Sequence, residues 1–317
     1  PDGRIANWGA RQLSQKQDKP LLLALGFYKP HQPFFAPTKY YDLYDVEKIF
    51  LPPTRTNDLA DVPPPGRDLA TRPWTSGTHR VVVKHKAWRD AVHAYLATVS
   101  FADALVGKVM AALDAGPHAD NTWVILWSDH GWKLGEYNGW GKMSNYEIDT
   151  RVPFIIAAPG MKTAGQSTDT PVELLDIFPT LCEMAGIPPP DFAQGTSLVP
   201  LLKNPAAKID RVAHSQYFRK HEGGEYMGYA MRTATHRFVE WREFGTGKVT
   251  ARELYDHRQN HSETANVIDT APEALVESLT SRLLKTHPRR PLQMVPAVHS
   301  NPNRGRQPAP LGLSNKT

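Results

Sequence analysis

Residues 122–131 read Thr-Trp-Val-Ile-Leu-Trp-Ser-Asp-His-Gly, and the predicted fold class depends first on these ten residues. Its first six residues are mostly apolar and β-branched, a composition typical of a short buried strand. Polar residues follow at once, where the strand ends. Ligands of open α/β sheets bind beyond the carboxyl ends of strands, so Asp129 and His130 are the first candidate site residues.

Further strands and helices are predicted on both sides of this stretch. Apolar runs at Pro20–Phe27 and Val152–Ala158 indicate two more buried strands. Apolar residues recur at spacings of three and four from about Lys86 to Ala115, and the pattern predicts a helix that Gly116-Pro117 ends. A second helix is expected over about Glu173–Ala185. This alternation of strands and helices predicts an α/β fold with a largely parallel sheet.

Beyond Pro205 the pattern changes to short strands separated by turns. These strands are expected at Val212–Phe218, Tyr229–Thr233, Arg237–Trp241 and Arg252–Tyr255. A helix should follow at about Pro272–Lys285, and the last residues are rich in Pro, Asn and Arg, as disordered tails are. We therefore predict three units: an α/β domain over 1–205, a C-terminal α+β subdomain over 206–287, and a disordered tail over 288–317.

Composition excludes several classes of protein. The chain has 317 residues, of which 40% are hydrophobic and 22% charged, so it is neither disordered nor a coiled coil. The single cysteine, Cys182, excludes an internal disulfide and a multi-cysteine metal cluster, and we expect it to pack in a helix core. The net charge of +5 is too diffuse to indicate nucleic-acid binding. Uninterrupted apolar runs are far shorter than the ~18 residues of a membrane span, so none is expected.

Three short segments carry candidate chemistry. Asp129 and His130 offer a carboxylate and an imidazole as a metal-binding pair, and the alternative is a polar turn. Lys142, in a glycine-rich loop, offers a point charge for an anionic substrate, and the alternative is a solvated lysine. Prolines flank Lys29 and His31 and fix the backbone that aims them; His31 is either a general acid or anion ligand, or an ordinary loop histidine.

Taken together, three segments resemble the sulfatase family, and most closely its iduronate-2-sulfatase branch. They are Gly26–Phe34, the block Ser128–Glu136 with Lys142–Asn145, and Arg151–Ile156. The combination of Ser-Asp-His-Gly with a following lysine is highly specific, although each piece alone is weak. Lesser similarities extend the resemblance over nearly all of the chain from Pro20 to about Lys285.

The resemblance implies an alkaline-phosphatase-like α/β/α sandwich, incomplete at its N-terminus, with a smaller C-terminal antiparallel sheet and helix. It also implies a sulfuric ester hydrolase that cleaves a sulfated sugar with bound calcium rather than magnesium. Asp129 and His130 would then be metal ligands, Lys142 and His31 would contact the sulfate or its leaving group, and Trp132 would shape the sugar pocket. Calcium and lysine would neutralise the sulfate, and His31 could protonate the departing sugar oxygen.

The resemblance also implies a nucleophile motif and an Asp-Asp pair upstream of the matched segments. The family nucleophile is a formylglycine made from the Cys or Ser of a Cys/Ser-x-Pro-x-Arg motif, and an Asp-Asp pair supplies further calcium ligands. Family order places both before Lys29, and residues 1–28 contain neither. We therefore expect the chain to be the C-terminal portion of a sulfatase, inactive alone, whose parent depends on formylglycine-generating machinery and resides in a periplasmic, secreted or lysosomal compartment.

Two other functions remain compatible with the residues. One is a phosphatase or phosphonate-ester hydrolase of the same fold. The other is a non-catalytic protein that binds sulfated glycans and has lost its nucleophile, for which the mildly basic charge is suitable. An intact nucleophile motif upstream would support an enzyme, and a reading frame that starts near Pro1 would support the binding protein.

Overall fold

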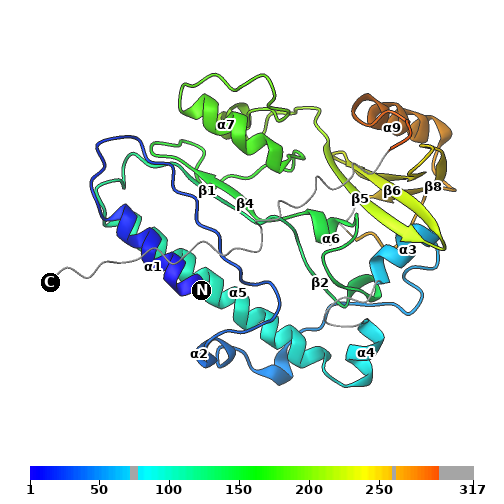
Figure 1. Cartoon of the computed structure of the whole chain (residues 1–317), viewed down its shortest axis with the longest axis horizontal. Coiled ribbons are helices and arrows are strands. Elements are labelled where there is room, and N and C mark those ends of the chain that lie inside the picture. The colour runs from blue at the N-terminus through cyan, green and yellow to red at the C-terminus, as the bar shows by residue number, and fades with distance from the viewer. Residues whose placement is uncertain (72–77, 259–261, 293–317) are drawn as a thin grey trace, which may run out of the picture.

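The computed structural model describes residues 1–71, 78–258 and 262–292 (Figure 1). These residues form an N-terminal part of helices around a small sheet and a C-terminal part with a larger sheet. The helices and 3-10 turns are α1 (Asp2–Leu13), α2 (Thr38–Tyr41), η1 (Val46–Lys48), α3 (Pro64–Thr71), α4 (His79–Lys84), α5 (Trp88–Asp114), η2 (Glu136–Asn138), α6 (Glu147–Thr150), η3 (Leu174–Asp176), α7 (Ile177–Met184), α8 (Val199–Lys203) and α9 (Glu273–Thr286). The strands are β1 (Val124–Trp127), β2 (Lys133–Leu134), β3 (Trp140–Gly141), β4 (Phe154–Ala157), β5 (Ala213–His221), β6 (Gly224–Arg232), β7 (His236–Glu243) and β8 (Val249–Asp256).

The strand that opened the sequence argument, β1, pairs with β4. The two run antiparallel, with register from Val124↔Ala157 to Trp127↔Phe154. The expectation of a largely parallel sheet is therefore wrong for this pair, because the chain returns through the β2–β3 hairpin and α6 rather than through a helical crossover. In Figure 1, α1 and α5 lie on one side of this pair and α7 lies on the other, which gives a helix–sheet–helix layering.

Helix α5 confirms the helix that the apolar spacing predicts over about Lys86–Ala115, and it has 27 residues. It packs against α1, a helix that the sequence argument did not anticipate. Among the described helices, α5 is the one that is long and apolar enough to cross a membrane. Core helices of soluble proteins have the same features, so this is weak evidence for a span.

The segment 20–27 is not the buried strand that its apolar run predicts. It pairs with no described strand, and most of its residues, including Leu21 and Leu22, are exposed. Leu25 instead packs on α1, where a Cβ at Gly9 would lie 2.5 Å from the Leu25 side chain. An apolar run of this length forms a strand only where a partner strand supplies hydrogen bonds, and none of the described strands does so here.

The C-terminal part confirms the predicted antiparallel sheet and helix. Its strands lie in the order β5-β6-β7-β8. One face packs on α9 through the buried side chains of Met231, Phe238, Leu254 and Leu283. On the other, Met143 packs against Ala230, Val239 and Trp241. Strand β7 is buried along nearly its whole length because both faces of the sheet are covered. The contact of Met143 with the sheet also fixes the loop that follows β3.

Residues 288–292, expected to belong to a disordered tail, lie against this sheet. The Leu292 N–H donates to the Phe244 carbonyl over 2.8 Å, and Arg289 Nη2 is 2.7 Å from Glu240 Oε2. These five residues therefore belong with the C-terminal sheet, and the rest of the predicted tail lies outside the described residues. Cys182 lies half-buried on α7 as a free thiol.

Candidate functional site

The candidate site begins where β1 ends. The Ser128 hydroxyl donates to the His130 carbonyl over 2.9 Å and shapes the turn. His130 Nδ1 lies 2.8 Å from the Gly131 carbonyl oxygen. Because a carbonyl oxygen only accepts, Nδ1 carries the proton and Nε2 presents its lone pair.

Lys142 directly follows β3, and its side chain reaches the two histidines of the site. Its ammonium Nζ lies 2.7 Å from His130 Nε2 and 3.1 Å from His31 Nε2. His31 Nδ1 lies 2.8 Å from the Gln32 carbonyl oxygen, so His31 has the same tautomer as His130. One ammonium thus donates to two neutral imidazoles, and residues 111 positions apart in the chain meet at one point.

The proline-flanked loop uses its lysine to hold its own shape. Lys29 Nζ donates to the His31 carbonyl over 3.3 Å and to the Pro33 carbonyl, and the Lys29 N–H donates to Asp2 Oδ2 over 3.0 Å. Burial lowers the pKa of Lys29. The backbone around His31 is therefore fixed by side-chain bonds as well as by the prolines.

Aromatic side chains form the wall of the site. Trp132 is 9% exposed, and its ring meets the His31 ring edge-on at a centroid distance of 4.9 Å. The Phe34 ring also contacts Trp132, at a centroid distance of 6.0 Å, and the Tyr28 ring lies 5.0 Å from that of His31. The indole nitrogen of Trp132 is buried, with no hydrogen-bond partner among the described residues. Trp132 therefore borders the cluster from inside the fold.

Asp129 lies at the open side of the site. Its side chain is 82% exposed, and Oδ1 lies 3.5 Å from His130 Nε2. Two neighbouring ligands of a calcium ion, each at about 2.4 Å, lie roughly 3.4 Å apart when they subtend a right angle, so the spacing of this pair fits such an ion. The His130 Nε2 lone pair accepts from Lys142 here, so His130 could bind the ion only after the ammonium moves away. Calcium takes about six to eight ligands, so Asp129 and His130 could supply only part of its coordination.

Comparison with family models identifies the family. The sulfatase model matches residues 2–187, more than half of the chain. A second model, the C-terminal region of N-sulphoglucosamine sulphohydrolase, matches residues 135–289. The chain belongs to the sulfatase family.

Relatives of known name agree with this assignment. A sulfatase of Formosa agariphila is 33% identical over 90% of this chain and 54% of its own length. The iduronate 2-sulfatase of Mus musculus is 30% identical over 83% of this chain and 61% of its own length. This sulfatase-family chain therefore spans little more than half the length of these relatives.

Solved structures confirm the alkaline-phosphatase-like fold. A phosphonate monoester hydrolase from Silicibacter pomeroyi superposes with a TM-score of 0.68 at 25% identity, covering 83% of this chain and 55% of that one. An enzyme solved with its substrate D-glucosamine-2-N,6-O-disulfate has a TM-score of 0.69 at 20% identity, covering 91% and 70%. Both share the fold with this sulfatase-family chain.

The nucleophile motif of the family is not found among the described residues of this sulfatase-family chain. Its pattern does occur once in the sequence, as Ser300-Asn301-Pro302-Asn303-Arg304. That stretch lies outside the described residues and beyond the ranges that both family models match. Cys182 has no proline two residues later and sits on α7, as expected for a packing residue.

A second cluster with metal-binding residue types lies between α6 and the C-terminal sheet. Candidate ligand atoms of Glu147, His257 and Glu263 lie within 4.8 Å of one another. Arg237 occupies the space between the carboxylates, with Nε 2.6 Å from Glu263 Oε1 and Nη2 bonded to Glu147. Burial alone would raise the pKa of Glu147, but Arg237 and Arg232 hold it below its ordinary value. The cluster is therefore a buried ion-pair network that already contains its cation.

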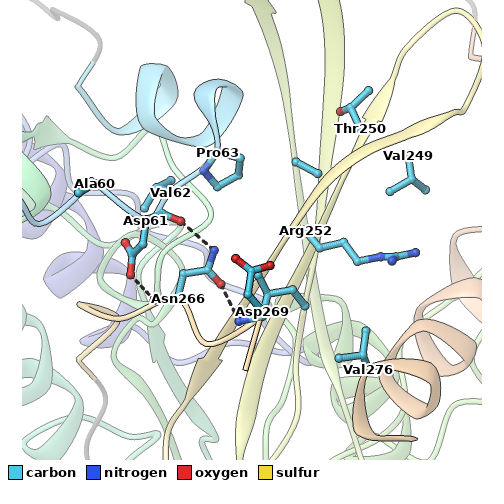
Figure 2. A pocket seen from close by; sticks show the side chains of 12 residues that line it. Ala60, Asp61, Val62, Pro63, Val249, Thr250, Arg252, Asn266, Asp269 and Val276 are labelled. Atoms are coloured by element: carbon cyan, nitrogen blue, oxygen red, sulfur yellow. Dashed lines mark hydrogen bonds between the residues drawn. The ribbon is translucent and has the colours of Figure 1, made fainter. Parts of the chain in front are cut away.

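A groove of about 730 Å³ lies away from all of these residues, beside β8 (Figure 2). Its walls include Asp61, Arg252, Asn266 and Asp269. The Asn266 amide bonds back to the Asp61 carbonyl over 3.0 Å, and the Asn266 N–H donates to Asp61 Oδ2 over 2.7 Å. None of the site residues predicted from the sequence lines this groove.

No local sequence pattern marks the buried residues that support the site. Lys133 stands inside the motif block, yet nothing in that block distinguishes it from a solvated lysine. Glu147 and Arg237 are 90 residues apart, and their pairing has no local pattern.

Proposed function

We propose that this chain is part of a calcium-dependent sulfuric ester hydrolase that removes sulfate from a sulfated sugar, as an iduronate-2-sulfatase does. The observation that carries the proposal is the meeting of Lys142 with His31 and His130 at the end of β1. Membership of the sulfatase family and the named relatives support the reaction class.

The ammonium of Lys142 binds the sulfate and offsets the negative charge that a nucleophile must approach. His31 is the general acid in its imidazolium form. Its Nδ1 stays bonded to the Gln32 carbonyl, so Nε2 must take up a proton once the Lys142 ammonium has turned to the sulfate, and Nε2 then passes that proton to the departing sugar oxygen. Trp132 forms a wall of the sugar pocket beside both histidines.

Asp129 and His130 would hold the calcium ion together with ligands from other groups, with the Lys142 ammonium displaced from His130 Nε2 towards the sulfate. When bound, the ion would supply positive charge against the sulfate oxygens. The nucleophile is expected to be a formylglycine installed by dedicated machinery, and the isolated 317-residue chain is expected not to turn over an aryl sulfate. A periplasmic, secreted or lysosomal location remains a prediction.

Two variants of the full-length protein test these roles. Lys142→Ala should lower kcat by roughly 10²–10³-fold, the scale for loss of one group that stabilises transition-state charge. Lys48→Ala is the control, since Lys48 is 84% exposed in an isolated ion pair. Asp129→Ala should weaken calcium binding in titration calorimetry. Unchanged turnover in the first variant would remove Lys142 from the site, and unchanged calcium affinity would remove Asp129 from the ligands.

The structural similarity to a phosphonate monoester hydrolase supports a second candidate reaction on the same fold. Rates on a sulfate ester, a phosphate ester and a phosphonate ester with the same leaving group separate the two. A strong preference for the phosphorus esters would favour this second candidate over the sulfatase.

A further inference from the structure

Lys133 lies one residue after Trp132 in the motif block, but its ammonium faces the protein interior. The side chain is 1% exposed and that of Asp149, its ion-pair partner, is 0% exposed. Lys133 Nζ also lies 3.3 Å from Ser144 Oγ, and Ser144 donates to the same Asp149 oxygen. A lysine this deeply buried cannot bind a substrate anion, so it needs another explanation.

The backbone around this pair joins the segments that carry the site. In the β2–β3 register Lys133 stands opposite Gly141, the residue before Lys142. The Gly131 N–H, next to His130, donates to the Asp149 carbonyl over 2.9 Å. The pair is therefore linked to both ends of the contact between Lys142 and His130.

Close packing leaves the pair little room to move. A Cβ at Gly139 would lie 2.8 Å from Lys133 Cε, and a Cβ at Gly131 would lie 1.9 Å from the Ile148 carbonyl oxygen. The Ser144 hydroxyl additionally accepts the Tyr146 N–H over 3.3 Å. Two glycines thus let the hairpin and α6 close directly over the ion pair.

We propose that Lys133 and Asp149 are positioning residues that hold the Lys142 ammonium against His130 and His31. A buried ion pair adds little net stability compared with apolar residues, but losing one partner is costly because it leaves an uncompensated charge. The surrounding backbone must then rearrange to solvate that charge, and the backbone that can move carries Lys142 on one side and His130 on the other. The positioning role can be tested without the proposed function of the site, and only its expected effect on turnover rests on that function.

The test uses imidazole ¹⁵N NMR of the 317-residue chain, which reports the contact without requiring activity. Lys142→Met gives the reference signals of His31 and His130 without the ammonium. In Lys133→Met and in Asp149→Asn, both sets of signals should move from the wild-type positions toward that reference. Lys48→Met is the matched control, because it breaks the exposed pair with Asp45 and should leave the signals unchanged.

Wild-type imidazole signals in a folded Lys133→Met chain would overturn the proposal. If neither variant folds even at low temperature, the proposal is also overturned, because the ion pair would then be needed for folding of the whole chain. Kinetics of the same variants in the full-length protein, where kcat should fall at least ten-fold, test the link to function. Shifted imidazoles with unchanged kcat would refute the proposed function and leave the positioning role intact.

Discussion

Replacing Arg237 with methionine tests the ion-pair network that joins α6 to the C-terminal sheet. Arg237 is 2% exposed and bonds to Glu263, Glu147 and the Thr150 hydroxyl. Methionine fills a similar volume, so the main loss is the positive charge between two buried carboxylates. Breaking a buried pair from one side costs about 3–5 kcal/mol.

Part of that cost is offset by the partners that remain. Arg232 Nε stays 3.1 Å from Glu147 Oε2, and His257 Nε2 stays 2.9 Å from Glu263 Oε1. We therefore expect the lower end of the range, about 3 kcal/mol, which lowers Tm by roughly 6–12 °C at ~2–4 °C per kcal/mol.

The loss should depend on pH with a defined sign. The folded pKa of Glu147 lies below its ordinary value because Arg237 and Arg232 outweigh burial. Its contribution is therefore present above the unfolded pKa of about 4.3 and is lost as pH falls through the folded pKa. The gap between wild type and Arg237→Met should be widest near neutrality and should narrow below about pH 4.

Urea unfolding followed by circular dichroism, at neutral and at acidic pH, measures both effects. Arg282→Met is the matched control, since its 2.8 Å pair with Asp210 is exposed and worth less than about 1 kcal/mol. The reasoning is refuted if Arg237→Met loses no more stability than Arg282→Met, or if its deficit grows as the pH falls.

Two further substitutions test other parts of the same scaffold. Glu253 is buried beside Tyr255 and Trp241, and burial raises its pKa to about 7. The folded chain therefore keeps a proton on Glu253 that the unfolded chain releases, so the contribution of Glu253 to stability should fall as pH rises from about 4.3 to about 7. In urea titrations, the unfolding free energy of the wild type should therefore fall relative to that of Glu253→Gln over this pH range. A difference between the two proteins that stays constant or rises with pH would contradict the assignment. Gly131→Ala would place a Cβ 1.9 Å from the Ile148 carbonyl and should cost about 1–3 kcal/mol in thermal unfolding, whereas Gly26→Ala, which opens into free space, should cost less than half as much; equal losses would show that the close approach is unimportant.

Periodicity and local pattern predicted the elements that depend on nearby residues. Helix α5 lies close to its predicted bounds, and each predicted C-terminal strand overlaps an observed one, because each carries its own apolar pattern. The start of β6 is wrong by five residues, since the strand begins at Gly224 and not at Tyr229. The candidate site residues came from motif blocks, and the structure brings His31, His130 and Lys142 into contact; their roles remain predictions.

The errors fall where a partner distant in sequence decides the outcome. Segment 20–27 has the composition of a strand but no strand to pair with among the described residues. The direction of β4 beside β1 depends on the path of the intervening loop, which short apolar runs do not encode.

Local sequence patterns were enough to indicate the family, the sheet and helix of the C-terminal part, and the residue types at the end of β1. Only the tertiary structure showed that Lys133 faces inward while Lys142 faces the histidines, although both are lysines of one hairpin. Alternation along a strand places side chains on opposite faces, but the buried face is the one against which the rest of the chain packs. Here Asp149 and Ser144 cover one face, and the other presents its lysine to His130 and His31.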